Sequence, residues 1–281
     1  MIVSTVSKHT SAVSLSKVVE RAPDLVSLYK AAGSSVRAHG LQGARAAVYL
    51  VLDRSRSMRP YYRDGTMQHL AEQVLSLSAH LDDDGIVPVV FFSTDVDGST
   101  DLALGRHRGR INKLHENLGH LGRTNYHWAM DEVIDHYIAS GSDAPALVIF
   151  QTDGEPTSKF AAERYLCKAA RLPLFWQFIG FGDPDDNEFA FLRKLDTLAV
   201  PAHRVVDNAG FFLAGRTPQT VDDAQLFDHL LQEFPLWLTA ARTARVLEQK
   251  PDQQPEPAGL PDVVERRAKS PALHHVQSCP R

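Results

Sequence analysis

Cysteine is scarce in this sequence of 281 residues, which contains only Cys167 and Cys279. Two cysteines so far apart provide no disulfide framework, and they are typical of a protein kept in a reducing compartment. No apolar run reaches the roughly 20 residues that cross a bilayer, and residues 1–20 lack the apolar core of a secretory signal. A formal charge of −4 gives no basic surface, so we expect no nucleic-acid partner. These absences predict a cytoplasmic protein without a transmembrane segment.

Short apolar segments alternate with amphipathic ones along most of the chain. Compact apolar runs predict buried strands, and apolar residues repeated every three or four positions predict helices. Residues 101–123 are ambiguous, with a short edge strand as one interpretation. The alternation predicts an α/β fold with three layers, in which a doubly wound, mostly parallel sheet is flanked by helices. We expect strands over residues 47–53, 86–92, 146–151, 174–181 and 203–206, and helices over residues 66–81, 126–138, 159–171, 188–198 and from residue 222.

The two ends of the chain differ from its middle. Apolar residues at helical spacing over residues 13–41, with Pro23 at a helix start and Gly40 at a stop, predict helices packed on the edge of a domain. From Lys250 on, prolines and scattered charges replace large apolar residues, which is typical of disorder. We therefore expect an N-terminal helical extension (1–45), one domain (46–245) and a disordered Pro-rich tail (246–281).

Polar side chains follow two of the predicted strands and precede one of the predicted helices. They form the segments Asp53-x-Ser55-x-Ser57, Gly122-Arg-Thr124-Asn125 and Thr152-Asp153-Gly154. In open α/β sheets ligands bind beyond the carboxyl ends of the strands, and hydroxyl and carboxylate oxygens suit hard divalent cations. Each residue alone could be a helix cap or part of a turn. The three segments together, in this order, favour a metal site.

The three segments resemble the metal-ion-dependent adhesion site of von Willebrand factor A (vWA) domains. The resemblance implies that Ser55, Ser57 and Thr124 contact the ion, and that Asp53 and Asp153 bind it directly or through water. Mg²⁺ is the expected ion, with Mn²⁺ or Ca²⁺ as alternatives. This ligand set leaves a divalent ion short of oxygens, so the Asp or Glu of a partner protein can complete its shell. The resemblance therefore implies a protein-interaction module and not an enzyme.

Segments away from the polar trio are similar to one branch of this group, the TerF-type vWA domain of bacterial tellurium-resistance and stress-response systems. They include Val13-Ser-Leu-Ser-Lys-Val-Val, Tyr62-Arg-Asp-Gly-Thr-Met-Gln, Phe175-Trp-Gln-Phe-Ile-Gly and Glu233-Phe-Pro-Leu-Trp-Leu. The similarity implies a cytoplasmic bacterial protein that works with other Ter-system proteins, some of which bind calcium. Residues 1–45 leave no room for such a calcium-binding domain, so these partners would be met in trans.

Two positions depart from the commoner motif. Arg56 stands where glycine usually separates the two serines, and Arg123 stands where a second glycine often precedes the threonine. Glycine tolerates positive φ, so arginine there implies either strain or a different loop path. Two or three guanidinium groups near the ion (Arg54, Arg56, Arg123) would either weaken cation binding by repulsion or steer an acidic partner toward it.

Two other functions remain open. Asp53 could be the nucleophile of a haloacid-dehalogenase-like phosphohydrolase, although that chemistry needs a second carboxylate where Ser55 stands. Alternatively, the arginines could disable the ion site and leave a metal-free vWA scaffold. Near the polar trio, one ring of Tyr126, His127 and Trp128 could flank the ion, with core packing as the alternative.

Two further segments resemble metal sites only superficially. Asp95-x-Asp97-x-Ser99-x-Asp101 begins like a calcium loop, but Thr100 and Arg106 occupy its glycine and glutamate positions, so a solvated loop is favoured. His115 and His120 are five residues apart, whereas zinc binding from one helical face requires a spacing of four.

Overall fold

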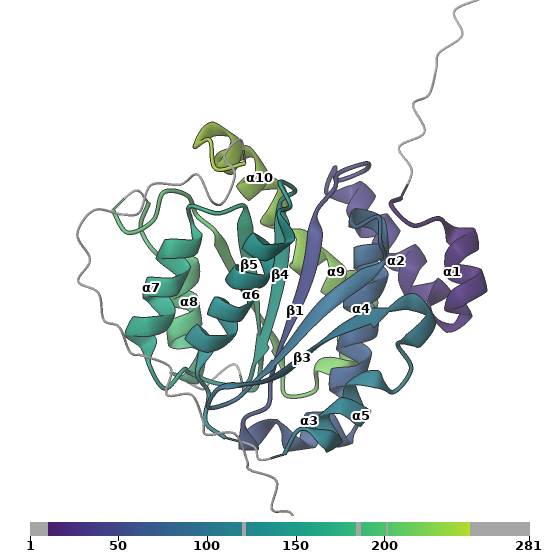
Figure 1. The fold of residues 1–281 in the computed structure, drawn as a ribbon, viewed down its shortest axis with the longest axis horizontal. Coiled ribbons are helices and arrows are strands. Elements are labelled where there is room, and N and C mark those ends of the chain that lie inside the picture. Colours follow the sequence, from purple (N-terminus) through teal and green to yellow (C-terminus); the bar gives the residue numbers. More distant parts are fainter. Residues whose placement is uncertain (1–10, 120–121, 184–186, 201, 248–281) are drawn as a thin grey trace, which may run out of the picture.

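Six strands form one sheet in the order β3-β2-β1-β4-β5-β6 (Figure 1). The computed structural model describes residues 11–119, 122–183, 187–200 and 202–247. All neighbouring strands are parallel except β3, which closes one edge antiparallel to β2. The predicted doubly wound, mostly parallel sheet is therefore confirmed. The strands are β1 (Ala47–Asp53), β2 (Ile86–Phe92), β3 (Val96–Ala103), β4 (Ala146–Thr152), β5 (Leu174–Phe181) and β6 (Ala209–Gly215).

Helices connect the strands and cover the sheet. The α-helices are α1 (Leu15–Arg21), α2 (Val26–Ala38), α3 (Arg59–Arg63), α4 (Thr66–Leu81), α5 (Arg110–Asn117), α6 (Tyr126–Ser140), α7 (Lys159–Ala169), α8 (Ala190–Asp196), α9 (Asp223–Leu231) and α10 (Phe234–Thr243). Short 3₁₀ turns are η1 (Pro23–Leu25), η2 (Arg56–Met58), η3 (Leu104–Arg106), η4 (Asn187–Phe189) and η5 (Pro218–Thr220). The helix predicted from residue 222 is thus divided into α9 and α10, with Pro235 in the first turn of α10.

Successive side chains of the inner strands enter two different apolar clusters. In β1, Val48 and Leu50 belong to a cluster shared with α2, α4, α9 and α10, whereas Tyr49 and Val51 belong to one shared with α6, α7 and α8. β4 and β5 are buried along their whole length, as expected for parallel strands covered on both faces. Burial of each large apolar side chain contributes about 1.5–3 kcal/mol, so the two clusters hold the strand ends in fixed positions.

The helices predicted within residues 13–41 are confirmed as α1 and α2, and α2 packs against α4. A Cβ atom on Gly33 of α2 would lie 2.7 Å from Cε1 of His80 in α4, so a larger residue there would have to displace the His80 ring. The ring of Tyr29 stacks on His80 with 4.1 Å between centroids. The Tyr29 hydroxyl also donates a hydrogen bond of 2.8 Å to the carbonyl of Val13. These helices therefore share the apolar cluster of the sheet.

The strand predicted over residues 203–206 is wrong, because the last strand is β6. Arg204 is only 2 % exposed, and its guanidinium donates to the carbonyl of Asp196, the last residue of α8, at 2.9 Å and to that of Leu198 at 3.0 Å. The chain therefore turns at this arginine to cover the helix carbonyls. Two adjacent valines suggested a strand, but a buried arginine bound to the backbone decides the local path.

The acidic segment 95–101 is neither a calcium loop nor a solvated loop. Apart from Asp95 it lies in β3, an edge strand that pairs with β2 from Val96 opposite Phe92 to Ala103 opposite Ile86. An edge strand exposes much of its surface, so polar side chains can alternate along it without loss of the backbone pairing. Part of the ambiguous segment 101–123 therefore completes the sheet edge, and α5 follows it.

Some predictions lie outside the described residues, among them those on His120 and on the tail from residue 248 on. None of the helices in the described ranges is both long and apolar enough to cross a membrane.

Candidate metal centre

Asp53 lies where the parallel strands β1 and β4 end side by side. Leu52 is in register with Gln151, which brings the following residues, Asp53 and Thr152, together. Asp53 is fully buried. One of its carboxylate oxygens accepts a hydrogen bond of 2.6 Å from the backbone N–H of Ser55, and the other accepts one of 2.6 Å from the Thr152 hydroxyl. The carboxylate is thereby fixed between the two loops.

The two serines and the second aspartate continue from this carboxylate as a chain of polar contacts. The Ser55 hydroxyl lies 3.2 Å from the Ser57 hydroxyl and donates to Oδ1 of Asp153 at 3.3 Å. Ser55 is buried and Asp153 half-buried, whereas Ser57 is exposed. Four of the five predicted ligands, Asp53, Ser55, Ser57 and Asp153, are therefore gathered at one end of the sheet, with the oxygens becoming more accessible toward Ser57.

Thr124 reaches the same place on a loop that is fixed against the turn between β2 and β3. A Cβ atom on Gly122 would lie 2.1 Å from the hydroxyl of Thr94, so glycine is required by this close approach. The Thr94 hydroxyl accepts a hydrogen bond of 2.9 Å from the backbone N–H of Arg123. Its carbonyl accepts one of 2.6 Å from the side chain of Asn125. Asn125, and not Thr124, is the N-cap residue of α6, so the capping interpretation of Thr124 is wrong.

An open depression of about 590 Å³ joins the Thr124 loop to the two serines. The carbonyl of Thr124 accepts a hydrogen bond of 2.7 Å from the backbone N–H of Thr157, which ties the loop to the segment after Asp153. Residues from two of the predicted segments thus line one surface, and Asp153 of the third segment contacts Ser55 beside it. The lining of the depression includes Ser55, Arg56, Ser57, Gly122, Arg123 and Thr124.

The electrostatics of the two aspartates suit a cation. Burial raises the pKa of Asp53 to about 7, and the neighbouring charge of Asp153 adds to the effect. Burial also raises the pKa of Asp153, although the hydroxyls of Ser57 and Ser55 oppose this by hydrogen bonding. Two carboxylates that share a poorly solvated site repel each other when both are charged, and a cation between them removes the repulsion.

The donor set is made of oxygen alone, which fits Mg²⁺, Mn²⁺ or Ca²⁺ better than zinc. Within the described ranges, no group of three or more histidine, cysteine, aspartate or glutamate side chains comes together to hold a metal ion. A cation at this site would therefore depend on the hydroxyls of Ser55, Ser57 and Thr124 as well as on the two carboxylates.

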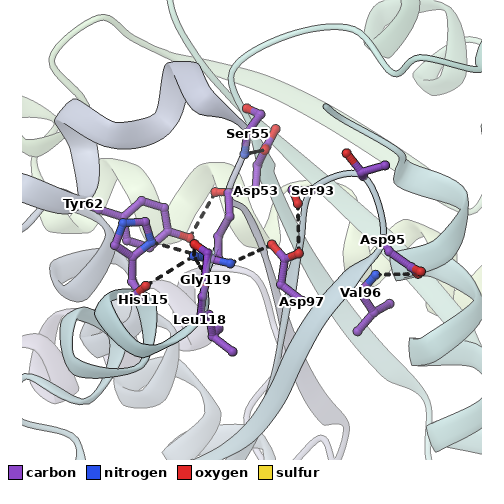
Figure 2. Close-up of polar contacts among 12 residues, drawn as sticks. Asp53, Ser55, Tyr62, Ser93, Asp95, Val96, Asp97, His115, Leu118 and Gly119 are labelled. Carbon is purple, nitrogen blue, oxygen red and sulfur yellow. Dashed lines mark hydrogen bonds and ion pairs between the residues drawn. The ribbon is translucent and has the colours of Figure 1, made fainter. Parts of the chain in front are cut away.

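Arg54 contacts Asp97, His115 and Leu118 and is not one of the charges facing the ion, so two arginines and not three remain near it. Figure 2 shows these three contact residues lying below Asp53 and Ser55 in the view. It is 1 % exposed and donates to Oδ2 of Asp97 in β3 at 2.8 Å. The same guanidinium donates to the carbonyls of His115 at 3.3 Å and Gly119 at 3.4 Å, and to that of Leu118. Side chains alternate in direction along extended backbone, so Arg54 leaves on the side opposite to Asp53 and Ser55. Its charge is satisfied by Asp97 and by the end of α5.

Tyr62 and His115 connect this buried network to Asp53. The Tyr62 hydroxyl donates a hydrogen bond of 3.0 Å to the backbone carbonyl of Asp53. Its ring stacks on that of His115 with 3.8 Å between centroids and 9° between planes. Burial and the charges of Arg54 and Arg59 lower the pKa of His115 to about 4, so the ring is neutral at pH 7. Its Nδ1 can therefore accept the hydrogen bond of 3.2 Å from Nε of Arg54.

Sequence reasoning missed Arg54, Tyr62, Asp97 and His115 as supports of the site. The sequence did contain one indication of this network: Arg54 follows a buried strand end, and a charge in such a place needs a partner. Nothing local identified Asp97 as that partner.

Arg56 and Arg123 do not strain the backbone. In the part of the chain that the structure describes, Arg245 is the only non-glycine residue with positive φ. Arg56 begins the η2 turn, and both guanidinium-bearing residues are exposed at the depression. The different loop path is therefore the correct alternative, and these two charges remain beside the candidate ion.

The aromatic residue at the start of α6 belongs to the core. Tyr126 is fully buried, and its hydroxyl contacts the carbonyl of Gly154 and, at 3.3 Å, the hydroxyl of Thr152. It therefore supports the loop from beneath and does not flank the ion from outside. His127 and Trp128 are half-buried, and a role for either in recognition stays a prediction.

A three-layer α/β fold with hydroxyl and carboxylate groups at the carboxyl ends of its strands defines a von Willebrand factor A-like domain. The chain belongs to the vWA-TerF-like family, described as the vWA domain found in the TerF C terminus, which matches residues 45–247. It is similar to the uncharacterized protein YcbR of Bacillus subtilis (strain 168), with 31% identity over 221 residues that cover 76% of this chain and 87% of YcbR.

Solved vWA structures are more distant. A von Willebrand factor type A protein from Catenulispora acidiphila has a TM-score of 0.45 and 15% identity, over 68% of this chain and 42% of that one. The chain thus spans less than half of that structure. The manganese-loaded TRAP protein of Plasmodium vivax has a TM-score of 0.45 and 23% identity, over 66% of this chain and 73% of that one.

Proposed function

We propose that this protein is a divalent-cation-dependent protein-interaction module. Ser55, Ser57 and Thr124 would contact Mg²⁺, Mn²⁺ or Ca²⁺, while Asp53 and Asp153 bind it directly or through water. An Asp or Glu of a partner protein would complete the coordination shell. The bound cation supplies positive charge that attracts this carboxylate, and the chain holds the oxygens in place. The observation that carries the proposal is the contact chain from Asp53 through Ser55 to Ser57 and Asp153.

The surrounding contacts support binding rather than catalysis. Both carboxylate oxygens of Asp53 accept hydrogen bonds from the two loops and the side chain is fully buried, which suits a group that supports an ion better than a nucleophile. Ser55 occupies the position at which the phosphohydrolase alternative needs a general acid. Metal-dependent turnover of p-nitrophenyl phosphate that is lost in Asp53→Asn would support the enzyme instead.

Titration of Mg²⁺ or Mn²⁺ tests the site directly, by calorimetry and by thermal unfolding. Wild-type protein should bind one ion and gain about 2.7 kcal/mol of stability at 100 times the dissociation constant. Ser55→Ala/Ser57→Ala should lose both responses, because two of the three hydroxyl ligands are removed. A matched control is Ser27→Ala/Ser99→Ala, which changes two exposed serines away from the site. Equal responses of wild type and the Ser55/Ser57 variant would remove the proposed site.

The cellular setting is part of the same proposal. Similarity to the TerF branch suggests a bacterial tellurium-resistance or stress-response assembly in the cytoplasm, with Ter-system proteins as partners. Affinity capture from the native host in Mg²⁺ and in chelator would test partner and ion together. Partner binding that persists unchanged in chelator would favour the metal-free scaffold.

A further inference from the structure

A second depression borders the candidate metal centre. It has a volume of about 730 Å³ and lies between α3 and α5, with Arg59 and Arg63 on one side and Asn112 and Glu116 on the other. Both helices lie together at the lower end of the view in Figure 1. Arg56 and Ser57 line this groove and also line the depression that contains Thr124. The two hollows therefore meet at Ser57, one of the proposed ion ligands.

Uncompensated positive charge distinguishes this double hollow. Arg56, Arg59, Arg63 and Arg123 are all exposed, and within residues 11–119 and 122–183 none of them forms an ion pair. Other exposed arginines, such as Arg21 and Arg242, also form no ion pair among the described residues, so the gathering of four of them around adjoining hollows is the distinguishing feature. The chain as a whole carries a formal charge of −4, so this local excess of guanidinium groups runs against the overall balance.

The acidic residues that line the hollows do not cancel this charge. Glu155 pairs with Lys159 at 2.5 Å, which leaves Glu116 as the acid that faces the groove without such a pair. Like charges held together on a surface repel one another, and an anionic ligand relieves the repulsion. Arginine also offers paired donors that match a carboxylate.

Asn112 adds a feature that suits a ligand with N–H donors. Its Oδ1 atom is buried at the wall of the groove and has no hydrogen-bond partner among the described residues. An unpaired buried acceptor is costly, and a donor N–H satisfies it. A polypeptide backbone carries such a donor at nearly every residue, whereas a polyphosphate carries none. The groove therefore fits an acidic peptide better than a polyphosphate.

We propose that an acidic segment of a partner protein lies across both hollows, with one carboxylate directed to the cation beside Ser57 and further carboxylates against Arg59 and Arg63. This inference rests on the proposed function and extends it, because it assigns the partner a run of acidic residues and not a single Asp or Glu. Guanidinium groups in the groove would also speed association with such a segment, and added salt would weaken the effect.

A labelled oligo-glutamate decapeptide is a suitable probe, with an oligo-glutamine decapeptide and a single-stranded oligonucleotide for comparison. Binding is followed by fluorescence anisotropy at low salt, in Mg²⁺ and in chelator. The groove variant is Arg59→Gln/Arg63→Gln. The control is Arg21→Gln/Arg242→Gln, which removes two exposed arginines from α1 and α10 and gives the same change in net charge.

The oligo-glutamate peptide should bind wild type and the control alike, and the groove variant about three- to tenfold more weakly, as expected for two surface charge pairs. Mg²⁺-dependent binding that is equal in the groove variant and the control would overturn this inference and leave the proposed function intact. Binding that depends on Arg59 and Arg63 but not on Mg²⁺ would support the acidic groove and count against the cation. Absence of peptide binding, or tighter binding of the oligonucleotide, would overturn the inference.

Discussion

Replacement of Arg54 with methionine should destabilise the protein by about 3–5 kcal/mol, the range for removal of one partner from a buried ion pair. Methionine fills similar space but leaves Asp97 opposite an apolar side chain. Burial already raises the pKa of Asp97 above its usual range in spite of Arg54, so the remaining carboxylate would be poorly solvated. The carbonyls of His115, Leu118 and Gly119 would also lose their charged donor at the end of α5.

Urea unfolding followed by circular dichroism measures this loss. Arg56→Met is a matched control, because Arg56 is exposed and a surface substitution should change stability by no more than about 0.5 kcal/mol. Arg54→Met/Asp97→Leu should be more stable than Arg54→Met alone, since it removes the stranded carboxylate as well. An Arg54→Met protein within 1 kcal/mol of wild type, by the same scale, would refute the assignment of Arg54 as the anchor of β3 and α5.

Three further predictions concern the candidate metal centre. Asp53 has a pKa of about 7 when folded and 3.8 as the ordinary value, so the unfolded state releases its proton first as pH rises. In chelator, the free energy of unfolding of the wild type should therefore fall by roughly 3 kcal/mol between about pH 4 and 7, and Mg²⁺ should restore it at pH 7.5. Urea titrations of Asp53→Asn should show neither effect. Gly122→Ala should weaken Mg²⁺ binding and lower the free energy of unfolding by about 1–3 kcal/mol, because the added Cβ would clash with Thr94. Mg²⁺ binding equal to that of the wild type in calorimetry would contradict this explanation of the loop. Arg56→Gln/Arg123→Gln should raise the affinity for Mg²⁺ about two- to fivefold in low salt, because two positive charges beside the ion are removed. An unchanged or lower affinity in calorimetry would contradict this prediction.

Much of the fold could be predicted because it depends on local patterns. The limits of α4, β2 and β5 agree with the predicted ranges 66–81, 86–92 and 174–181. In each of these segments the apolar residues are spaced for one kind of structure, and the flanking polar residues end it. β3 and β6 were missed or misplaced because an edge strand carries polar residues, and because glycines interrupt the apolar run in Ala209–Gly215.

The oxygen-bearing residues were also identified from the sequence. Asp53, Ser55, Ser57 and Asp153 follow strand ends that must meet at one edge of a parallel sheet, so their proximity follows from the topology. Thr124 is different, because its loop is held by Thr94 and by Thr157, and neither contact can be inferred from local sequence.

By itself, the sequence determined which oxygens end the strands and which segments are helix or strand, since both follow from residue chemistry and short-range periodicity. Only the tertiary structure decided where the charges of the motif go. Arg54 is buried against Asp97, whereas Arg56 and Arg123 remain at the surface beside the candidate ion. The direction of a side chain depends on the backbone path and on partners far away in the chain, and these are set only when the sheet and its helices have packed together.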